Sequence, residues 1–351
     1  MRNTIKLGKR IIGEGHPVFI VAEVGVNHNG NKELAFELVR QAKKLGADCV
    51  KFQTFKAETV VTQNAPKAAY QLKVTDPKES QFDMLKKLEL SADAYRRVIA
   101  LSQELNIQFL ATPYDFRDVD FLNDLGVGAF KIASGQLVEL PFLTYVAKLG
   151  KPIILSTGMA TFEEIKETVE TIRRAGNDQL ILLQCTTNYP SVVEEVNLRA
   201  METMKQKLRV LVGYSDHTES HFSAFAAAAL GAVVIEKHFT LDRDFPGPDQ
   251  ACSLEPEEFA GLVRGIREIE KALGDSEKKP TAAELKNLIG MRRSLAIVKD
   301  ILPGAPIKKE HLAFKRPATG LPPKRMEEVI GKRAKKKIPA DTILTEEFIE
   351  W

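Results

Sequence analysis

Runs of hydrophobic residues alternate with amphipathic segments along the first three quarters of the chain. Each run is nearly continuous in apolar residues, which is typical of a strand buried on both faces of a parallel sheet. Between the runs, apolar residues recur at helical spacing, which predicts helices at 33–45, 92–105, 116–125, 161–176, 198–205, 223–230 and 256–273. Eight strand-then-helix units result, and they begin at Val18, Cys49, Gln108, Ala129, Ile153, Leu180, Val210 and Val233.

Eight such units predict an α/β fold, a (β/α)8 TIM barrel preceded by a short pair of strands within residues 5–12. An open doubly wound sheet is the alternative, but the segment 25–30 lacks its glycine-rich fingerprint. After Gly274 the pattern changes to short segments separated by Pro and Gly turns. We therefore expect a barrel over 1–274, a linker over 275–289 and a small, mostly β module over 290–351.

One connection in the barrel is unusual. The polar stretch 56–81 is longer than the loops that ordinarily join the units of a barrel. Long loops of this kind are often active-site lids or binding loops. We expect such a role for this segment.

Composition narrows the class of partner and the cellular compartment. Fifty basic and 47 acidic residues give a net charge of +3, too balanced to indicate nucleic acid or a membrane surface as the main partner. The three cysteines, Cys49, Cys185 and Cys252, indicate neither a disulfide framework nor a zinc knuckle. The chain shows neither a signal-peptide pattern nor an apolar stretch long enough to span a membrane. We expect a cytoplasmic protein.

Polar residues stand at the end of every predicted strand, where barrel enzymes build their active sites. They are Glu23, Lys51, Gln53, Thr112, Lys131, Ser134, Ser156, Thr187, Ser215, Asp216, His217, Glu236 and His238. Packing alone would explain one or two polar strand ends, but not eight of eight. A shared active site is the better interpretation.

Two of these residues, Lys51 and Lys131, interrupt apolar runs and each needs an anion nearby. Their structural partners would be Glu23 or Asp216. Together with the hydroxyls at the strand ends, they favour a phosphorylated, acidic small molecule as the ligand. A Schiff base formed by either lysine is the alternative.

Two histidines, His217 and His238, end neighbouring late strands, and His28 is the only other histidine near a strand end. A single histidine there is usually structural. Two on adjacent strands favour a divalent metal, because two imidazoles leave coordination positions open for substrate and water. Asp249, shortly after the last strand, would orient a polyhydroxylated substrate or a ligand histidine.

Seven motifs at the strand ends together resemble the N-acetylneuraminate (sialic acid) synthases, a family that includes the legionaminic acid synthases. They are Glu23-Val-Gly-Val-Asn-His-Asn-Gly30, Lys51-Phe-Gln-Thr54, Lys131-Ile-Ala-Ser-Gly135, Leu155-Ser-Thr-Gly-Met159, Gly213-Tyr-Ser-Asp-His-Thr218, Glu236-Lys-His-Phe-Thr240 and Gly247-Pro-Asp249. The tail resembles that family's antifreeze-like (SAF) domain through Arg293-Ser-Leu, Lys315-Arg-Pro317 and Gly331-Lys332.

The resemblance implies a transferase of carbohydrate biosynthesis that condenses phosphoenolpyruvate with an N-acylated amino sugar and releases phosphate. It implies phosphoenolpyruvate binding by Lys51, Thr112, Lys131, Ser134, Ser156, Ser215 and, at a position where the motif departs from some relatives, Thr187 or Asn188. It implies sugar contacts from Glu23, Gln53, Tyr189 and Asp249, and from Arg316 of the partner in a domain-swapped homodimer. His217 and His238 would hold Mn²⁺, with Mg²⁺ or Co²⁺ as substitutes, and Glu23 would order a water or move a proton.

The resemblance leaves the sugar open. Our main interpretation is an N-acetylneuraminate synthase that uses an N-acetylmannosamine-type sugar. The alternative is an N,N'-diacetyllegionaminate synthase that uses 2,4-diacetamido-2,4,6-trideoxymannose. Two other classes, a metal-dependent barrel hydrolase and an inert barrel carrying an ice- or carbohydrate-binding tail, fit the filled strand ends less well.

Overall fold

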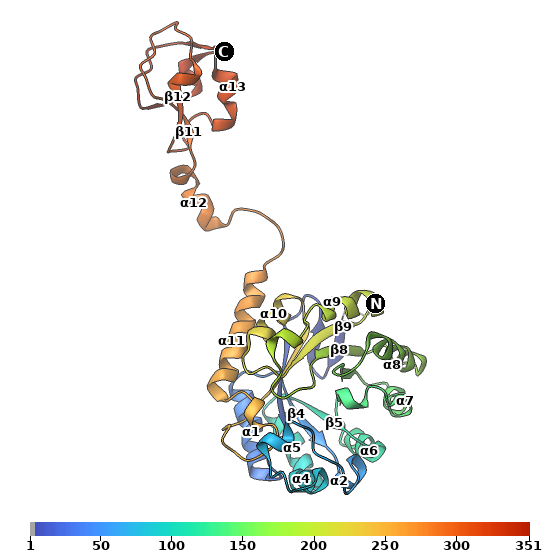
Figure 1. Cartoon of the computed structure of the whole chain (residues 1–351). Helices are drawn as coiled ribbons and strands as arrows, with labels where there is room; N and C mark the ends of the chain where they lie inside the picture. Colours follow the sequence, from blue (N-terminus) through green and yellow to red (C-terminus); the bar gives the residue numbers. More distant parts are fainter. Residues whose placement is uncertain (1–3) are drawn as a thin grey trace. The chain divides into compact units, whose positions relative to one another are not determined.

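The computed structural model describes residues 4–351, and the chain divides into two compact units at Gly274. The larger unit ends at Gly274, and the smaller one begins at Asp275 (Figure 1). Each is described by itself below. Within residues 4–351, no helix is both long and apolar enough to cross a membrane.

The larger unit is built on an eight-stranded parallel sheet in the order β5-β4-β3-β10-β9-β8-β7-β6. Its outermost strands, β5 and β6, also lie against each other, so the sheet closes and the predicted TIM barrel is confirmed. The strands are β3 (Phe19–Gly25), β4 (Cys49–Thr54), β5 (Gln108–Pro113), β6 (Phe130–Ile132), β7 (Ile153–Ser156), β8 (Leu180–Cys185), β9 (Leu211–Asp216) and β10 (Val234–His238).

Helices cover the outside of this barrel (Figure 1). They are α1 (Lys32–Lys44), α5 (Ala92–Glu104), α6 (Phe116–Asp124), α7 (Leu140–Lys148), α8 (Phe162–Arg174), α9 (Ala200–Leu208), α10 (Phe222–Ala229) and α11 (Pro256–Leu273). A capping box begins α8, with Thr161 Oγ1 accepting from the amide of Glu164 and Glu164 Oε2 accepting from the amide of Thr161. The strands read as unbroken apolar runs because their outer residues pack under these helices and their inner residues fill the barrel.

The amino end of the barrel is apolar. The predicted strand pair is an antiparallel hairpin of β1 (Thr4–Leu7) and β2 (Arg10–Gly13). Its side chains Ile5, Leu7 and Ile12 join one buried cluster with inward residues of the strands, such as Phe19 and Ile181. The hairpin therefore belongs to the same hydrophobic core as the barrel interior, and the polar residues are left to the carboxyl end.

The long polar segment between β4 and α5 folds into three short helices, α2 (Ala57–Val60), α3 (Gln71–Val74) and α4 (Gln81–Leu88). A buried lysine, Lys67, holds its tip together. The Lys67 ammonium donates to Thr75 Oγ1 at 2.9 Å and to the Asp76 carbonyl at 2.8 Å, and it pairs with Glu79 at 3.1 Å. We call residues 56–81 the lid segment.

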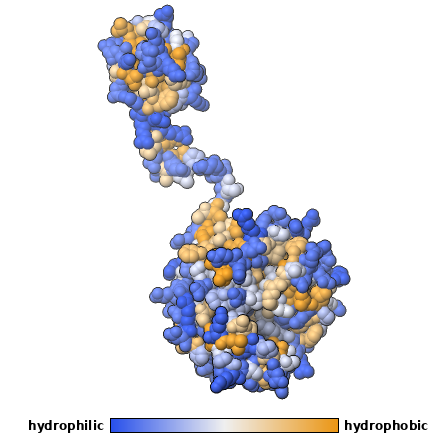
Figure 2. Space-filling model, viewed as in Figure 1, coloured by the Kyte–Doolittle hydropathy of each residue, from blue (hydrophilic) through white to orange (hydrophobic). Residues whose placement is uncertain are grey.

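The smaller unit has its own apolar core, formed by residues such as Leu295, Ile307, Val329 and Leu344. It contains α12 (Ala282–Met291), β11 (Ser294–Ile297), β12 (Leu312–Lys315), α13 (Met326–Val329), β13 (Arg333–Ala334), β14 (Thr342–Ile343) and β15 (Ile349–Glu350). Helix α12 begins inside residues 275–289, which the composition had suggested to be a linker. Figure 2 shows hydrophilic residues over much of the visible surface of both units, with hydrophobic ones in scattered groups.

Candidate active site

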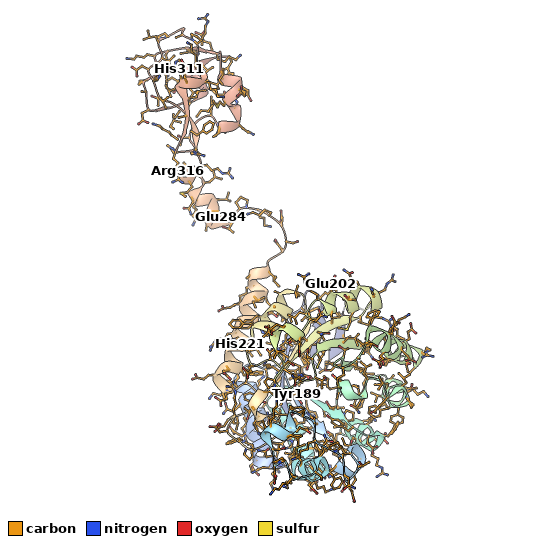
Figure 3. The ribbon with its side chains drawn as sticks, in the orientation of Figure 1. Tyr189, Glu202, His221, Glu284, His311 and Arg316 are labelled. Atoms are coloured by element: carbon orange, nitrogen blue, oxygen red, sulfur yellow. The ribbon has the colours of Figure 1, made fainter. Side chains whose placement is uncertain are left out.

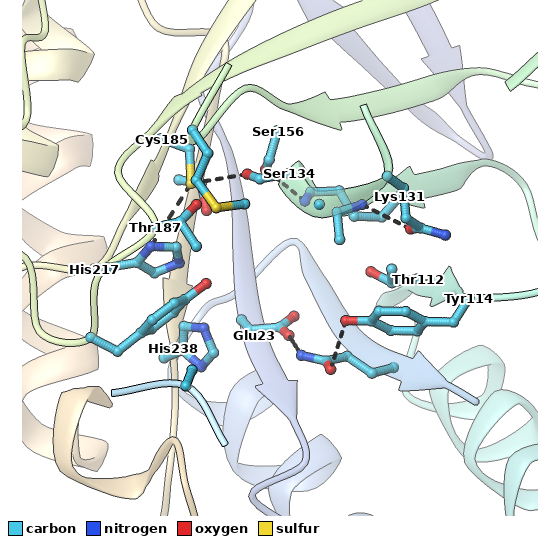
Figure 4. Close-up of a pocket in the computed structure, with 18 of the residues that line it drawn as sticks. Glu23, Thr112, Tyr114, Lys131, Ser134, Ser156, Cys185, Thr187, His217 and His238 are labelled. Carbon is cyan, nitrogen blue, oxygen red and sulfur yellow. Dashed lines mark hydrogen bonds between the residues drawn. The ribbon is translucent and has the colours of Figure 1, made fainter. Parts of the chain in front are cut away.

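A cavity of about 450 Å³ opens at the carboxyl ends of the barrel strands. Most of the residues that the sequence proposed for the site line it together. They are Glu23, Lys51, Gln53, Thr112, Lys131, Ser134, Ser156, Thr187, Tyr189, Ser215, His217 and His238. Figure 4 shows His217 and His238 on one side of the cavity, Lys131 on the other, and Glu23 between them.

Four buried charges of alternating sign form the floor of the cavity. Lys51 Nζ lies 2.8 Å from Glu23 Oε2 and 3.4 Å from Glu236 Oε1. Lys131 Nζ lies 3.5 Å from the same Glu236 oxygen and donates to Ser156 Oγ at 2.7 Å. Each lysine therefore has the anion that its burial requires, and each also faces the cavity.

Burial and the neighbouring charges displace the pKa values of these four groups in different directions. Burial favours the neutral form of Glu236, but Lys131 and Lys51 outweigh it and lower the pKa of that carboxyl to about 2. Burial raises the pKa of Glu23, although Lys51 opposes it. Burial lowers the pKa of Lys131, whereas the charges of Glu23 and Glu236 raise that of Lys51 against the effect of its burial. Glu23 is thus the carboxyl of this group best able to exchange a proton.

Beside the lysines, small side chains leave room for an anion. Ser134 Oγ accepts a hydrogen bond from the amide of Gly158 at 2.9 Å. A Cβ atom on Gly158 would lie 2.1 Å from Thr187 Oγ1, so only glycine fits between these hydroxyls. Within the described part of the chain, the buried Thr187 Oγ1 has no hydrogen-bond partner. Together with the lysines, these groups can bind a phosphate or a carboxylate.

The two histidines lie close enough to share a cation, with ring centroids 5.4 Å apart. The Nδ1–H of His217 can donate to the Thr186 carbonyl at 2.8 Å, which leaves Nε2 as the ligand atom. Burial holds the pKa of His238 well below its usual value, and its buried Nδ1 has no hydrogen-bond partner among the described residues. A neutral imidazole with a vacant lone pair is what a metal ligand requires.

The protein itself supplies few further ligands. Among residues 4–351, no group of three or more His, Cys, Asp or Glu side chains is arranged to hold a metal ion. Asp249 Oδ2, the nearest carboxylate to the second histidine, lies 3.9 Å from His238 Nδ1. The pair therefore fits a cation whose remaining ligands come from substrate and water.

Polar groups next to the histidines converge on Gly25. A Cβ atom there would lie 2.9 Å from Glu23 Oε1, 3.2 Å from Gln53 Nε2 and 3.5 Å from Asp249 Oδ2. Gly25 has φ +53°, so its conformation also favours glycine. Burial and the charge of Glu23 raise the pKa of Asp249 to about 7. These side chains offer hydrogen bonds to a polyhydroxylated ligand.

Aromatic rings close the cavity on the same side. The ring centroid of Tyr189 lies 4.1 Å from that of His217 and 4.8 Å from that of Tyr70 in the lid segment. The lid segment also contributes Gln71, whose Oε1 accepts from Gln81 Nε2 at 3.1 Å. The expectation that this segment belongs to the binding site agrees with its position.

Some predicted residues lie elsewhere. Asp216 faces away from the cavity and pairs with Lys237 at 3.0 Å, so the prediction that it serves Lys51 or Lys131 is wrong. The alternation of side chains along β9 explains this, because Ser215 points inward and its neighbour must point outward. The ring of His28 packs on that of Phe52, 5.8 Å between centroids. Arg316 belongs to the smaller unit, where its Nε donates to the Met291 carbonyl at 3.0 Å (Figure 3).

The structure also adds residues to which the sequence gave no role. Glu236 was recognised only as a polar strand end, although it alternates with Lys237 and so shares the inward face with His238. Tyr114 donates through its hydroxyl to Gln53 Oε1 at 3.2 Å. Cys185 Sγ lies 3.8 Å from His217 Nδ1. No local sequence pattern indicated that Tyr114 or Cys185 would line the site.

Comparison with known families gives two matches that together span most of the chain. A sequence model of the NeuB family matches residues 38–278. A model of the SAF domain matches residues 292–350, which confirms the domain expected from the tail.

Similar proteins are known at the level of sequence and of structure. The chain is 48% identical over 329 residues to N,N'-diacetyllegionaminic acid synthase of Campylobacter jejuni subsp. jejuni serotype O:2, covering 93% of this chain and 98% of that protein. It is 43% identical over 342 residues to the enzyme of the same name from Legionella pneumophila, covering 96% of each. The crystal structure of N-acetylneuraminic acid (sialic acid) synthetase from Leptospira borgpetersenii, in complex with citrate, has a TM-score of 0.72 and 34% identity, covering 81% of this chain and 94% of that one.

Proposed function

The chain belongs to the NeuB family, and from this membership we propose that it condenses phosphoenolpyruvate with an N-acylated amino sugar to a nine-carbon 2-keto acid and phosphate. The prediction of a sialic or legionaminic acid synthase is confirmed at the level of enzyme class by the relatives that cover nearly the whole chain. The observation that carries the proposal is the pocket itself, with a site for an anion at one side and a histidine pair at the other.

The half of the pocket that can bind an anion suits phosphoenolpyruvate. Its phosphate and carboxylate would contact Lys51, Lys131, and the hydroxyls of Ser134 and Thr187. Asn188 lines a neighbouring cavity, which favours Thr187 over it for this contact. Binding would satisfy the free Thr187 hydroxyl and add negative charge beside the two cations.

The other half of the pocket suits the sugar. Gln53, Asp249 and Tyr189 would hold its hydroxyl and N-acyl groups beside His217 and His238. A divalent metal, Mn²⁺ as the first candidate and Mg²⁺ or Co²⁺ as substitutes, would supply a Lewis acid for the aldehyde oxygen when bound by the two imidazoles.

The bond changes follow from this placement. C3 of phosphoenolpyruvate forms a bond to the aldehyde carbon as the C2=C3 π bond breaks, and the electron pair of the aldehyde C=O π bond passes to its oxygen, which takes up a proton and becomes a hydroxyl. Positive charge is left at C2, near the carboxylates of the floor. Water adds to C2, and loss of phosphate then yields the keto group. Glu23, which lies beside Lys51 and has a raised pKa, would order that water or accept its proton.

The comparisons favour the alternative sugar over our main interpretation. The two relatives that are 48% and 43% identical are both named N,N'-diacetyllegionaminic acid synthases, whereas the sialic acid synthetase with the similar fold is 34% identical. We therefore propose 2,4-diacetamido-2,4,6-trideoxymannose rather than N-acetylmannosamine as the acceptor.

Phosphate release from phosphoenolpyruvate with each sugar, side by side and with Mn²⁺, tests this assignment. We expect kcat/KM for the diacetamido sugar to exceed that for N-acetylmannosamine by on the order of 10²-fold or more, because a site that hydrogen-bonds a second N-acyl group would leave its polar groups unpaired with N-acetylmannosamine. Equal values of kcat/KM, or a preference for N-acetylmannosamine, would contradict this assignment and favour an N-acetylneuraminate synthase, our main interpretation of the sequence.

We further propose that the enzyme works in the cytoplasm as a domain-swapped homodimer, with Arg316 reaching the partner's sugar site. The exposed Arg316 guanidinium and the small separate unit that carries it support this arrangement. Mixing Arg316→Ala and His238→Ala subunits should restore activity, because each mixed dimer has one site with both residues intact. Mixtures as inactive as the two variants alone would contradict it.

A further inference from the structure

Behind the histidine pair, a second layer of charge lies on the opposite face of the same strands. Along β9 and β10 the side chains alternate, so Asp216 and Lys237 point away from the cavity that Ser215 and Glu236 face. The two outward residues are directly paired in the strand register, and both are fully buried. Lys237 Nζ lies 3.0 Å from Asp216 Oδ2.

This ion pair also holds the chain on both sides of His217. The Lys237 ammonium donates to the carbonyl oxygen of Thr218 and, at 3.1 Å, to that of Ser220. The other oxygen of Asp216 accepts from the amide of Thr218 at 2.9 Å and from its hydroxyl at 2.8 Å. Two of the three hydrogen bonds of the lysine therefore go to the turn that follows His217, and the third goes to Asp216. The aspartate oxygen that holds the Thr218 amide and hydroxyl also accepts from the Tyr214 hydroxyl at 3.1 Å.

Stability is a poor explanation for this arrangement. Taking two charges out of water is costly, and buried ion pairs are often matched or surpassed in stability by apolar pairs of similar size. What an apolar pair lacks is direction, because it cannot fix particular carbonyl and amide groups of a turn. Lys237 directly precedes His238, and Asp216 directly precedes His217, so the pair connects the backbones of both imidazoles.

We propose that Lys237, through Asp216, is a positioning residue that fixes the distance between His217 and His238 and so sets the affinity of the site for a divalent metal. The inference rests on the proposed function in one respect, the use of the two histidines as metal ligands. Side chains behind metal ligands typically change metal affinity by roughly 10- to 100-fold when they are altered. Neither residue touches the reacting groups, so the effect is on geometry.

The test is a titration of the full-length protein with MnCl2, followed by the EPR signal of free Mn²⁺, without either substrate. We expect Lys237→Met to raise the Kd for Mn²⁺ by roughly 10- to 100-fold. The KM for phosphoenolpyruvate, measured at saturating Mn²⁺, should stay close to that of the wild type. Arg267→Met is the matched control, because Arg267 also pairs with a buried aspartate, Asp48 at 2.7 Å, but at the amino end of the barrel.

The double variant Asp216→Leu/Lys237→Met distinguishes positioning from an unpaired charge, and it keeps the test open if Lys237→Met fails to fold. We expect it to bind Mn²⁺ as weakly as the single variant, because the turn is still released. Wild-type affinity in the double variant, or equal weakening by Arg267→Met, would overturn the proposal, as would a wild type that does not bind Mn²⁺. If the wild type still released phosphate normally in any of these cases, the proposed reaction would be supported and only the positioning role of Lys237 would be contradicted.

Discussion

The two ends of the barrel are built from the same eight strands and differ in almost every physical respect. At the amino end, the hairpin residues Ile5, Leu7 and Ile12 pack with inward strand residues into one apolar cluster. At the carboxyl end, the same strands present two lysines and two carboxylates to a cavity of about 450 Å³. Along each strand, only a few residues separate the amino end, where apolar side chains pack together, from the carboxyl end, where charged side chains face the cavity.

This difference indicates that the residues at the carboxyl end contribute less to the free energy of folding than apolar residues in their place would. Buried charges such as Glu236 and Lys131 are poor contributors to folding, and removal of one partner leaves the other uncompensated. Side-chain atoms without partners, Thr187 Oγ1 and His238 Nδ1, lie at the carboxyl end among the residues that the structure describes. Such atoms are best understood as ligand contacts that the folded chain does not satisfy by itself.

The largest expected effect comes from the histidine pair. We expect His238→Ala to reduce turnover by about 10³-fold, equivalent to the several kcal/mol that a Lewis acid supplies. Phosphate release with and without a chelator measures it. His221→Ala is the control, since the ring of His221 packs on that of Phe225, 5.0 Å between centroids, away from the site. Substantial turnover by His238→Ala in the presence of chelator would remove the metal assignment.

Removal of one lysine should come next. Lys51→Met leaves Glu23 and Glu236 without their shared cation, so the pocket would repel phosphoenolpyruvate. We expect kcat/KM for phosphoenolpyruvate to fall on the order of 10²- to 10³-fold, as for other lost charge-stabilising donors. Lys151→Met, at the amino end of β7 where Lys151 lies over the Phe130 ring, should leave kcat/KM unchanged. Similar losses in both variants would contradict the division between the two ends.

The raised pKa of Asp249 predicts a pH dependence. A carboxyl group with a pKa of about 7 is protonated below that pH and charged above it. If its carboxylate binds the sugar, kcat/KM for the sugar should rise about tenfold between pH 6 and pH 8. A divalent cation near His238 would favour the charged form and move this rise to lower pH. Asp249→Asn should flatten the profile, and an unchanged rise in that variant would assign it to another group.

The smallest effect on activity should come from the apolar end. Ile12→Ala removes a fully buried side chain from the cluster under the hairpin. We expect a loss of roughly 2–5 kcal/mol in the free energy of unfolding, measured by urea denaturation, with kcat and both KM values unchanged at a temperature where the protein stays folded. A large drop in kcat would show that the two ends are coupled.

The sequence predicted the barrel because parallel strands covered on both faces produce unbroken apolar runs that few other folds require. It also predicted most of the pocket, since a polar residue at the end of such a run points to the carboxyl end. Asp216 was misplaced because strand-end position was read without the two-residue alternation that assigns it to the outer face. The sequence could not predict that Tyr70 and Gln71 line the pocket, because the course of the lid segment depends on long-range contacts such as that of Tyr70 with Tyr189.

Phosphate release under omission of each component tests the central claim most directly. The full-length protein would be incubated with phosphoenolpyruvate, the diacetamido sugar and Mn²⁺, and with each left out in turn, while mass spectrometry follows the sugar. The account predicts phosphate only in the complete mixture, in equal amount to a product heavier than the sugar by the pyruvate unit. Phosphate released without the sugar, or consumption of phosphoenolpyruvate without that product, would contradict it.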